Sequence, residues 1–259
     1  MRAGRCASIR TRVTRWSACS RSSGTQRPRR TAAEPRRDYA VTVASVVTVN
    51  SAHIGADGKT PRTGIDKRPV EGPVPIRAPG LMRGGLGSGI VGDVIGNRKL
   101  HGGDDQAVYA YAREDLDVWA GRLGRDLTNG MFGENITTAG IDVTGALIGE
   151  RWRVGADGLM LEVTRPRTPC QTFAKRLGIG GWIKTFTHGG SPGAYLRVLE
   201  PGSISGGDSV DVIERPDHGI TIGFVYRALM LEPDLLPAIL EADALPDDLR
   251  RLAQRRAAD

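Results

Sequence analysis

Cysteine is scarce in this sequence, and its scarcity excludes several kinds of protein. Three of the 259 residues are cysteines, and two of them, Cys6 and Cys19, lie within the first 37 positions. The rest of the chain has one, Cys170, so it has no intramolecular disulfide framework, which favours a reducing compartment, the cytoplasm. One cysteine is also too few for a cysteine-ligated iron–sulfur cluster in this part of the chain, because such clusters are held by about four.

Zinc-site spacings and long apolar runs are also missing. No Cys-x-x-Cys and no pair of histidines separated by three to five residues occurs, so the ligand spacing of a structural zinc site is absent. No apolar run reaches the roughly 18 residues that a membrane span needs. The best candidate, residues 41–49, is short and interrupted by Thr and Ser. Near the N-terminus no apolar stretch of about 7–15 residues indicates a secretory signal.

Acidic residues are almost absent from residues 1–37, which hold eleven Arg, no Lys and one acid, Glu34. Taking these from the 36 basic and 29 acidic residues of the whole chain leaves 25 and 28, so residues 38–259 carry about −3. The sequence pI near 9.7 therefore reflects the N-terminal arm. This argues against a nucleic-acid-binding surface on the rest of the chain.

We expect residues 1–37 to be a disordered arm, because they have no apolar pattern with which to bury a face. The composition fits an organelle transit peptide, or an arm that binds nucleic acid or another acidic surface. It also fits sequence upstream of a true start near Val41 or Val43, where the strand pattern begins abruptly.

Residues 38–259 are dominated by short strand-like runs separated by Gly and Pro turns, at 39–49, 65–70, 74–78, 107–111, 136–138, 147–154, 159–163, 194–199 and 209–213. Helical patterns occupy 113–123 and 171–177, and from about Ile220 the chain turns helical, with short helices at 235–240 and 245–252. We therefore predict a mainly β fold with α: a β-barrel body, residues 38–215, and a small helical appendage, residues 216–259.

Residues 165–170, Arg-Pro-Arg-Thr-Pro-Cys, lie between a predicted strand and a predicted helix. The two prolines stiffen the approach to Cys170, and a helix N-terminus with nearby basic residues favours the thiolate form of cysteine. A thiolate is both a nucleophile and a ligand for soft metals. Arg165 and Arg167 would suit an anionic cofactor or substrate. A buried, inert cysteine fits the same pattern equally well.

A metal-free Cys/His enzyme is the first alternative, because any histidine of the chain could pair with Cys170 in the fold. None of the four, His53, His101, His188 and His218, has a diagnostic local spacing. The glycine-dense residues 80–96 are either a flexible loop or a place where backbone approaches another group closely.

Five short motifs together resemble the MOSC domain family (molybdenum cofactor sulfurase C-terminal domain), in its YiiM-like subgroup. They occur in the family's order over residues 40–256: Thr-Gly-Ile-Asp-Lys at 63–67, Gly-Asp at 92–93, His-Gly-Gly-Asp-Asp at 101–105, Phe-Gly-Glu-Asn at 132–135 and Pro-Arg-Thr-Pro-Cys at 166–170. Two positions depart from the pattern: Ile95 stands where Gln is common, and Asn97 where an acid is usual.

The resemblance implies a β-barrel that binds a molybdenum–pterin cofactor, with Cys170 as the catalytic residue and metal ligand; pyridoxal phosphate binding is a further association of the family. It implies reduction of N-hydroxylated compounds, such as hydroxylamino-purines and amidoximes, with electrons from a flavoprotein or iron–sulfur reductase. A non-enzymatic carrier or delivery module for the cofactor or its sulfur is the alternative.

The resemblance also suggests roles for single residues, although each of them also fits a structural role. Lys67 and Arg167 would hold the cofactor's phosphate and pterin, His101 would donate a hydrogen bond or a proton, and Asn135 would orient cofactor or substrate. The Gly102-Gly103 turn would bring backbone N–H groups to the cofactor. We expect two acids to tie loops to backbone N–H groups without reacting, Asp105 and Glu134.

Overall fold

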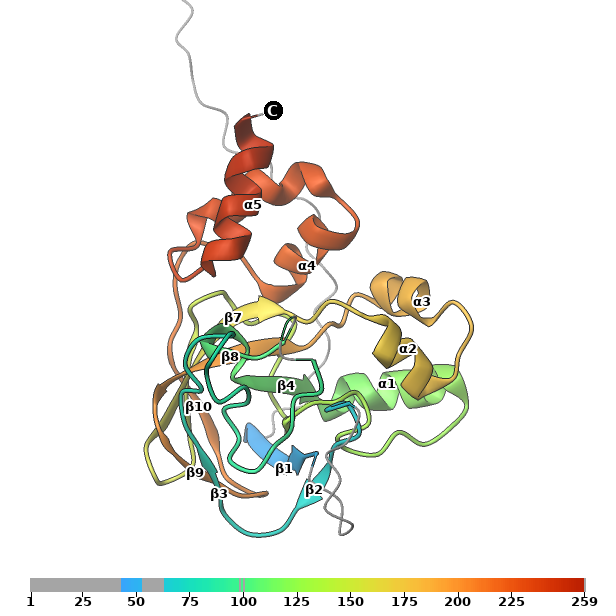
Figure 1. Cartoon of the computed structure of the whole chain (residues 1–259), viewed down its shortest axis with the longest axis vertical. Coiled ribbons are helices and arrows are strands. Elements are labelled where there is room, and N and C mark those ends of the chain that lie inside the picture. The colour runs from blue at the N-terminus through green and yellow to red at the C-terminus, as the bar shows by residue number, and fades with distance from the viewer. Residues whose placement is uncertain (1–42, 53–62, 98, 100, 259) are drawn as a thin grey trace, which may run out of the picture. The chain divides into compact units, whose positions relative to one another are not determined.

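The structure is a computed structural model that describes residues 43–52, 63–97, 99 and 101–258 (Figure 1). The predicted arm, residues 1–37, lies outside the described residues, as do Cys6, Cys19 and His53. Residues 37–259 form one compact unit. None of the helices in the described ranges is long and apolar enough to cross a membrane.

Eight strands form one sheet in the order β10-β6-β7-β8-β4-β5-β1-β2. All neighbours in it are antiparallel except β4 and β5, which run parallel. The remaining two strands, β3 and β9, pair separately. The strand bounds are β1 Ser45–Ser51, β2 Arg68–Val70, β3 Val74–Ile76, β4 Val108–Ala112, β5 Ile136–Ala139, β6 Arg151–Val154, β7 Leu159–Pro166, β8 Ala194–Glu200, β9 Gly202–Ile204 and β10 Val210–Glu214.

The start of β1 approaches the segment that leads into β10, near the other end of the sheet. The backbone N of Val210 donates to the carbonyl O of Ala44 at 2.8 Å, and the N of Val46 donates to the O of Asp208 at 2.8 Å. These bonds curl the sheet on itself. The strand order of the described residues is still open, so the mainly β fold with α is confirmed, while the closed barrel stays a prediction.

The helices are α1 Arg113–Leu123, α2 Gln171–Leu177, α3 Trp182–Gly189, α4 Ile222–Met230 and α5 Asp247–Ala258, with two 3₁₀ helices, η1 Asp104–Gln106 and η2 Pro233–Glu241. The helices predicted at 113–123 and 171–177 coincide with α1 and α2. Figure 1 shows α4 and α5 together beyond β7, and α1, α2 and α3 grouped at another side of the sheet.

Each predicted strand overlaps an observed one, and the runs predicted at 147–154 and 159–163 contain β6 and β7, which pair antiparallel as a hairpin. The run predicted at 147–154 begins too early, because residues 147–150 form a turn in which the N of Glu150 donates to the O of Leu147. Sequence patterns missed α3 and β9. Helix α3 is built from aromatic and β-branched residues of modest helix propensity, and packing of Trp182 and Phe186 stabilises it.

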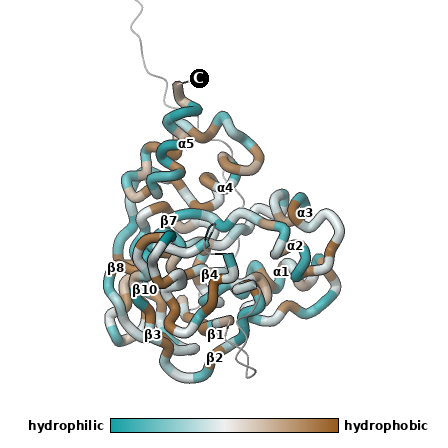
Figure 2. The backbone as a smooth tube through the Cα atoms, in the orientation of Figure 1, coloured by the Kyte–Doolittle hydropathy of each residue, from teal (hydrophilic) through white to brown (hydrophobic). Residues whose placement is uncertain are grey.

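The buried side chains form two clusters. The larger one joins the sheet to the C-terminal helices, since Trp152 and Leu161 belong to the same cluster as Val225 and Ile239. The predicted helical appendage therefore shares its core with the sheet, while the boundary at residue 215 itself remains a prediction. Figure 2 shows α5 as a mixture of hydrophilic and hydrophobic residues, as expected for a helix with one buried face.

The smaller cluster is aromatic and lies among α1, α2, α3 and β4. Most of its ring pairs meet edge-on or tilted and one pair, Trp119 with Phe186, is stacked, at centroid distances of 5.0–6.2 Å, and partly buried Cys170 packs against the cluster. Members that matter below are Tyr109, Phe132 and Phe173. This cluster is the wall on which the Cys170 segment rests.

Candidate functional site

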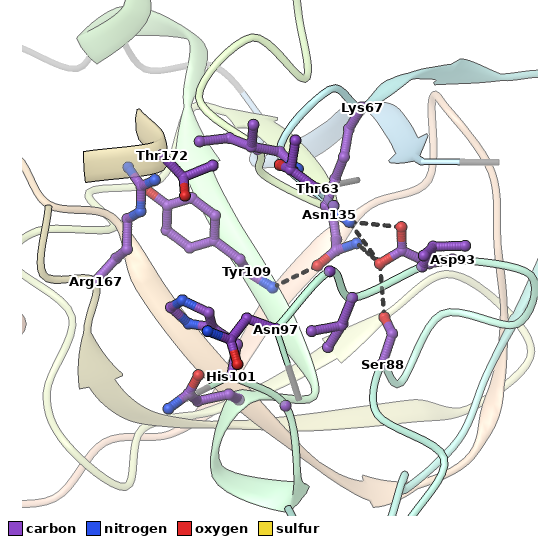
Figure 3. A pocket seen from close by; sticks show the side chains of 18 of the residues that line it. Thr63, Lys67, Ser88, Asp93, Asn97, His101, Tyr109, Asn135, Arg167 and Thr172 are labelled. Atoms are coloured by element: carbon purple, nitrogen blue, oxygen red, sulfur yellow. Dashed lines mark hydrogen bonds and ion pairs between the residues drawn. The ribbon is translucent and has the colours of Figure 1, made fainter. Parts of the chain in front are cut away.

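A pocket of about 570 Å³ lies where seven segments meet (Figure 3). Its volume is within the range of about 300–1,000 Å³ that is usual for small-molecule and cofactor sites. The segments are distant in sequence: 63–67, 88–97, 101–106, strand β4, 132–135, the junction of β7 with α2, and strand β8. Residues more than 100 positions apart in the sequence thus line the same cavity.

Six of the eight predicted site residues line this pocket: Lys67, His101, Gly102, Asn135, Arg167 and Cys170. The other two, Gly103 and Arg165, are not among its lining residues. The structure therefore brings together most of the residues that the motifs singled out, although no motif by itself predicted their proximity.

Cys170 immediately precedes α2 and is a free, partly buried cysteine. Its backbone is extended, with φ −130° and ψ 169°, and its carbonyl accepts the hydrogen bond from the N of Ala174 at 3.1 Å. Strand β7 ends at Pro166, so residues 167–169 carry the chain from the sheet to the pocket wall. Cys170 is therefore not the fully buried cysteine that the sequence left open, because it is partly exposed and lines the pocket.

Arg167 is buried, with 6% of its surface exposed. The centre of its guanidinium lies 3.8 Å from the ring centroid of Phe173 and 5.5 Å from that of Tyr109. Its Nη1 atom has no hydrogen-bond partner among the residues that the structure describes. A buried donor left unsatisfied is costly, and a charged one more so, which makes this nitrogen the clearest sign of a ligand in the pocket.

Lys67 and Asp93 form a buried ion pair at the opposite side of the pocket. The Nζ of Lys67 lies 2.5 Å from each carboxylate oxygen of Asp93, and the exposed fractions of the two side chains are 6% and 1%. Burial lowers the pKa of Lys67, and the charge of Asp93 opposes that shift. Asp93 also accepts from Ser88 Oγ at 2.8 Å and from the N of Ala52 at 2.9 Å.

Asn135 links this ion pair to β4 (Figure 3). Its Nδ2 donates to Asp93 at 3.0 Å, and its Oδ1 accepts from the backbone N of Tyr109 at 3.1 Å. Next to it, Glu134 accepts from the N of Gly130 and the N of Phe132, as predicted for a carboxylate that ties a loop. Burial raises the pKa of Glu134 despite these bonds.

His101 and Gly102 occupy the rim formed by residues 101–106. Burial, and then the positive charge of Arg167, lower the pKa of His101, while a hydrogen bond with Gln106 opposes them. The imidazole is therefore neutral at pH 7. Among the described histidines, His188 and His218 do not line the pocket. A ring nitrogen of His188 is hydrogen-bonded to the carbonyl O of Lys184, and one of His218 to the carbonyl O of Ile148.

The two glycines of the predicted turn serve close packing within the chain. Gly102 has φ 95°, and a Cβ there would lie 2.8 Å from the carbonyl O of Gly87. Gly103 has φ 85°, and a Cβ there would lie 2.8 Å from the N of Met82. The close backbone approach expected of this glycine-rich region thus occurs between the loop 80–87 and the turn.

Two residues, Arg165 and Asp105, make other contacts in the structure than those predicted for them. Arg165 does not reach the pocket, because its Nη1 donates to both oxygens of Asp248 in α5, at 2.8 and 3.0 Å. Asp105 binds the guanidinium of Arg197 and not a backbone N–H. The preceding acid, Asp104, is the one that holds a loop, because its carboxylate accepts a hydrogen bond from the backbone N of Gly80 at 2.8 Å. Arg165 still belongs to β7, whereas Arg167 lies beyond the end of that strand, and consecutive residues of the 3₁₀ helix η1 such as Asp104 and Asp105 point about a third of a turn apart.

Sequence analysis did not single out several lining residues, among them Ser88, Asp93, Tyr109, Phe132, Thr172 and Tyr195. Asp93 had a signal, since it belongs to the Gly-Asp motif of the family resemblance. Phe132 had the same kind of signal, since it opens the Phe-Gly-Glu-Asn motif, whereas Tyr109 and Tyr195 had none, because tyrosine in a strand is more often part of a core.

Comparison with known proteins is decisive for the family. The MOSC domain model matches residues 97–211. The "Uncharacterized protein YflK" of Bacillus subtilis (strain 168) is 34% identical to this chain over 171 residues, which cover 66% of this chain and 72% of YflK. This chain belongs to the MOSC domain family. The resemblance that the five motifs indicated is thereby confirmed.

Further relatives of this MOSC protein support the same family assignment. "Protein YiiM" of Escherichia coli (strain K12) is 28% identical over 174 residues, covering 65% of this chain and 76% of YiiM. A crystal structure of YiiM from Geobacillus stearothermophilus has a TM-score of 0.66 at 27% identity, covering 82% of this chain and 98% of that one. A "Reductase" of Gibberella moniliformis (strain M3125 / FGSC 7600) is 29% identical over 195 residues, and the match spans 33% of that protein.

Proposed function

We propose that this protein is a molybdenum-cofactor-dependent reductase of N-hydroxylated compounds, such as hydroxylamino-purines and amidoximes. Electrons would come from a separate flavoprotein or iron–sulfur reductase. One observation carries the proposal: in a MOSC-family chain, the free Cys170 and the buried Arg167, whose Nη1 has no hydrogen-bond partner among the described residues, line the same pocket.

The pocket residues fit a molybdenum–pterin group. A thiolate is a soft ligand suited to such a metal, and Cys170 is the cysteine that lines the cavity. Arg167 offers an unsatisfied donor for the group's anionic end. Tyr109, Phe132 and Tyr195 provide aromatic walls for a flat ring system. When bound, the cofactor supplies the two-electron reduction of an N–OH group to N–H and water, while the protein binds and orients.

His101 is the residue best placed to handle protons in this pocket. Its lowered pKa keeps the ring neutral at pH 7, so one ring nitrogen donates a hydrogen bond and the other accepts one. A neutral imidazole beside a leaving hydroxyl orients that oxygen and relays a proton from solvent. The buried Tyr109 and the partly buried Tyr195, whose ring centroids lie 5.1 Å apart, form an apolar part of the pocket wall.

The relative named Reductase supports an enzymatic role. Because the match spans a third of that protein, its name describes a longer chain than this one. We propose a separate flavoprotein or iron–sulfur reductase as the electron donor, as the family resemblance implies.

The test is metal and pterin analysis of protein expressed in a cofactor-producing host, alongside the Cys170→Ala variant. We expect about one molybdenum and one pterin per chain in the native protein, and loss of turnover of a hydroxylamino-purine with a supplied reductase in the variant. Folded native protein without molybdenum would overturn the proposal. Bound cofactor without turnover, with several reductases tried, would favour the carrier instead.

A further inference from the structure

Residues 79–87 form a loop that holds large apolar side chains in solvent. Leu81 is 79% exposed, Met82 is 36% exposed and Leu86 is 52% exposed. Single apolar residues are common on protein surfaces, but three within six positions of one loop form a patch. A patch of this kind indicates a surface that another molecule covers.

The loop is fixed by hydrogen bonds, so its apolar side chains are presented in a defined arrangement. The backbone N of Leu86 donates to the carbonyl O of Pro79 at 2.7 Å, and the N of Gly80 donates to the carboxylate of Asp104 at 2.8 Å. The turn is tight, because a Cβ on Gly85 would lie 2.6 Å from the O of Pro79. A preorganised surface of this kind loses little conformational entropy when a partner binds.

The same loop packs against the rim of the pocket. The N of Gly103 donates to the O of Gly87 at 3.1 Å, and a Cβ on Gly102, which lines the pocket, would lie 2.8 Å from that same oxygen. The rim continues through His101, whose N donates to the O of the exposed Asn97 at 3.1 Å (Figure 3). A molecule seated on residues 79–87 therefore lies next to the rim of the pocket.

Two exposed cations flank the apolar patch. Arg83 and Lys99 line one hollow together with Met82 and Gly84. Neither cation forms an ion pair with a residue of the described ranges. This charge contrasts with the rest of the chain, since residues 38–259 carry about −3. Complementarity of charge therefore favours an acidic partner at this surface.

We propose that the loop 79–87, together with Lys99, is the docking surface for the electron donor, and that this donor is an acidic flavoprotein. The need for a donor rests on the proposed function. The exposed edge of a flavin ring is flat and apolar, which suits contact with Leu81 and Met82, since methionine packs favourably against aromatic rings. An iron–sulfur cluster has no apolar group of its own to offer. Two electrons leave the reduced flavin, which becomes oxidised, and with two protons they convert N–OH into N–H and water.

The small size of the patch favours this occupant over two others. Weak electron-transfer complexes bury less than about 1,200 Å² in total, which one loop and its surroundings can supply, whereas a stable dimer usually buries more. Attachment to an anionic membrane usually takes a cluster of about four to eight basic residues. The hollow beside the loop has two, Arg83 and Lys99, among the residues that the structure describes.

The test is calorimetric titration of the protein with a purified flavodoxin, a small acidic protein that carries FMN, at low ionic strength. We expect Leu81→Ser combined with Arg83→Glu to weaken binding about tenfold or more, because an apolar anchor is lost and a charge is reversed. Matched controls change the same residue types on elements that do not line the pocket: Val118→Ser on α1, where Val118 is 50% exposed, and Arg251→Glu on α5. Both should bind flavodoxin as the native protein does.

Four outcomes would overturn the docking surface: no binding of flavodoxin by the native protein, native affinity in the double variant, an equal loss in the controls, or binding that rising salt does not weaken. Tighter binding of an acidic iron–sulfur ferredoxin would overturn the choice of a flavoprotein. Binding to vesicles of anionic lipid that the double variant abolishes would assign the patch to a membrane instead. Circular dichroism establishes that each variant is folded.

Turnover measurements separate this inference from the proposed function. With reduced flavodoxin as donor, the double variant should show a raised KM for flavodoxin. With dithionite-reduced methyl viologen, a small donor that needs no docking surface, it should turn over a hydroxylamino-purine as the native protein does. Loss of turnover with the dye would show that the loop shapes the pocket and would overturn the docking role. Protein without molybdenum would overturn the proposed function, while the flavodoxin titration would still decide the docking surface.

Discussion

At the scale of single residues, the pocket contains side chains whose chemistry depends on their partners. Cys170 is free, Arg167 lacks a hydrogen-bond partner for Nη1, and Lys67 is paired with Asp93. Each of these states predicts a different response to substitution.

Removing the thiol should abolish activity without affecting the fold. Cys170 is partly exposed and makes no hydrogen bond through its side chain at the cap of α2, so Cys170→Ala should change the free energy of unfolding by less than about 1 kcal/mol. Molybdenum content and turnover should both fall sharply. Undiminished turnover in this variant would contradict the role of Cys170 as the metal ligand.

Removing Lys67 should destabilise the protein. Lys67→Met leaves the carboxylate of Asp93 buried without its cation, and breaking a buried pair in this way costs about 3–5 kcal/mol. Urea unfolding monitored by circular dichroism measures the change. For comparison, Arg153→Met removes an exposed partner of Asp211 and should cost no more than about 1 kcal/mol. Equal effects of the two substitutions would show that the buried pair is not structural.

Stability should fall at mildly acid pH through His101. The pKa of its folded form lies below its ordinary value of 6.5, so the folded state binds fewer protons than the unfolded state. The contribution of His101 to stability is present above pH 6.5 and is lost as the pH falls through the folded-state pKa. His101→Gln should flatten the pH dependence of the urea midpoint in this window, and an undiminished pH dependence in this variant would contradict the prediction.

At the scale of elements, helix α3 shows packing overriding local propensity. It was not predicted from sequence, yet Trp182 and Phe186 on it are fully buried against Trp119 and Phe132. The helix supports α2, which begins after Cys170, so its packing bears on the position of the candidate metal ligand.

A pair of glycine substitutions tests this element. Gly189→Ala in α3 places a Cβ 2.3 Å from the buried ring of Trp119, so it should destabilise the protein despite the better helix propensity of alanine. Gly121→Ala in α1 meets nothing within 4 Å and should stabilise by about 0.5–1 kcal/mol. Thermal unfolding of the two variants measures the difference, and stabilisation by both would show that Trp119 moves aside freely.

At the scale of the whole molecule, the C-terminal helices and the sheet share one hydrophobic cluster. Val225, Ile239 and Leu249 belong to the same cluster as Trp152 and Leu161 of the sheet. The ion pair of Arg165 with Asp248 adds a polar connection between α5 and the stretch that leads to Cys170.

Truncation after residue 215 should therefore not leave a stable sheet. Losing α4, η2 and α5 would expose the buried face of the sheet to water, which costs about 25 cal/mol for each Å² of apolar surface. We expect the shortened chain to aggregate or to unfold without a cooperative transition, as judged by calorimetry. A cooperative transition with a native-like midpoint would show that the helices are an independent appendage.

The sequence by itself determined the family, most of the strands, helices α1 and α2, and the stretch 165–170, because these depend on local patterns and on motifs of a few residues. It also led to six of the pocket residues through the family's motifs. Only the tertiary structure decided that Arg167 points into the pocket while Arg165 pairs with α5, and that Lys67 is already neutralised by Asp93. Those distinctions depend on contacts between segments distant along the chain, which no local pattern encodes.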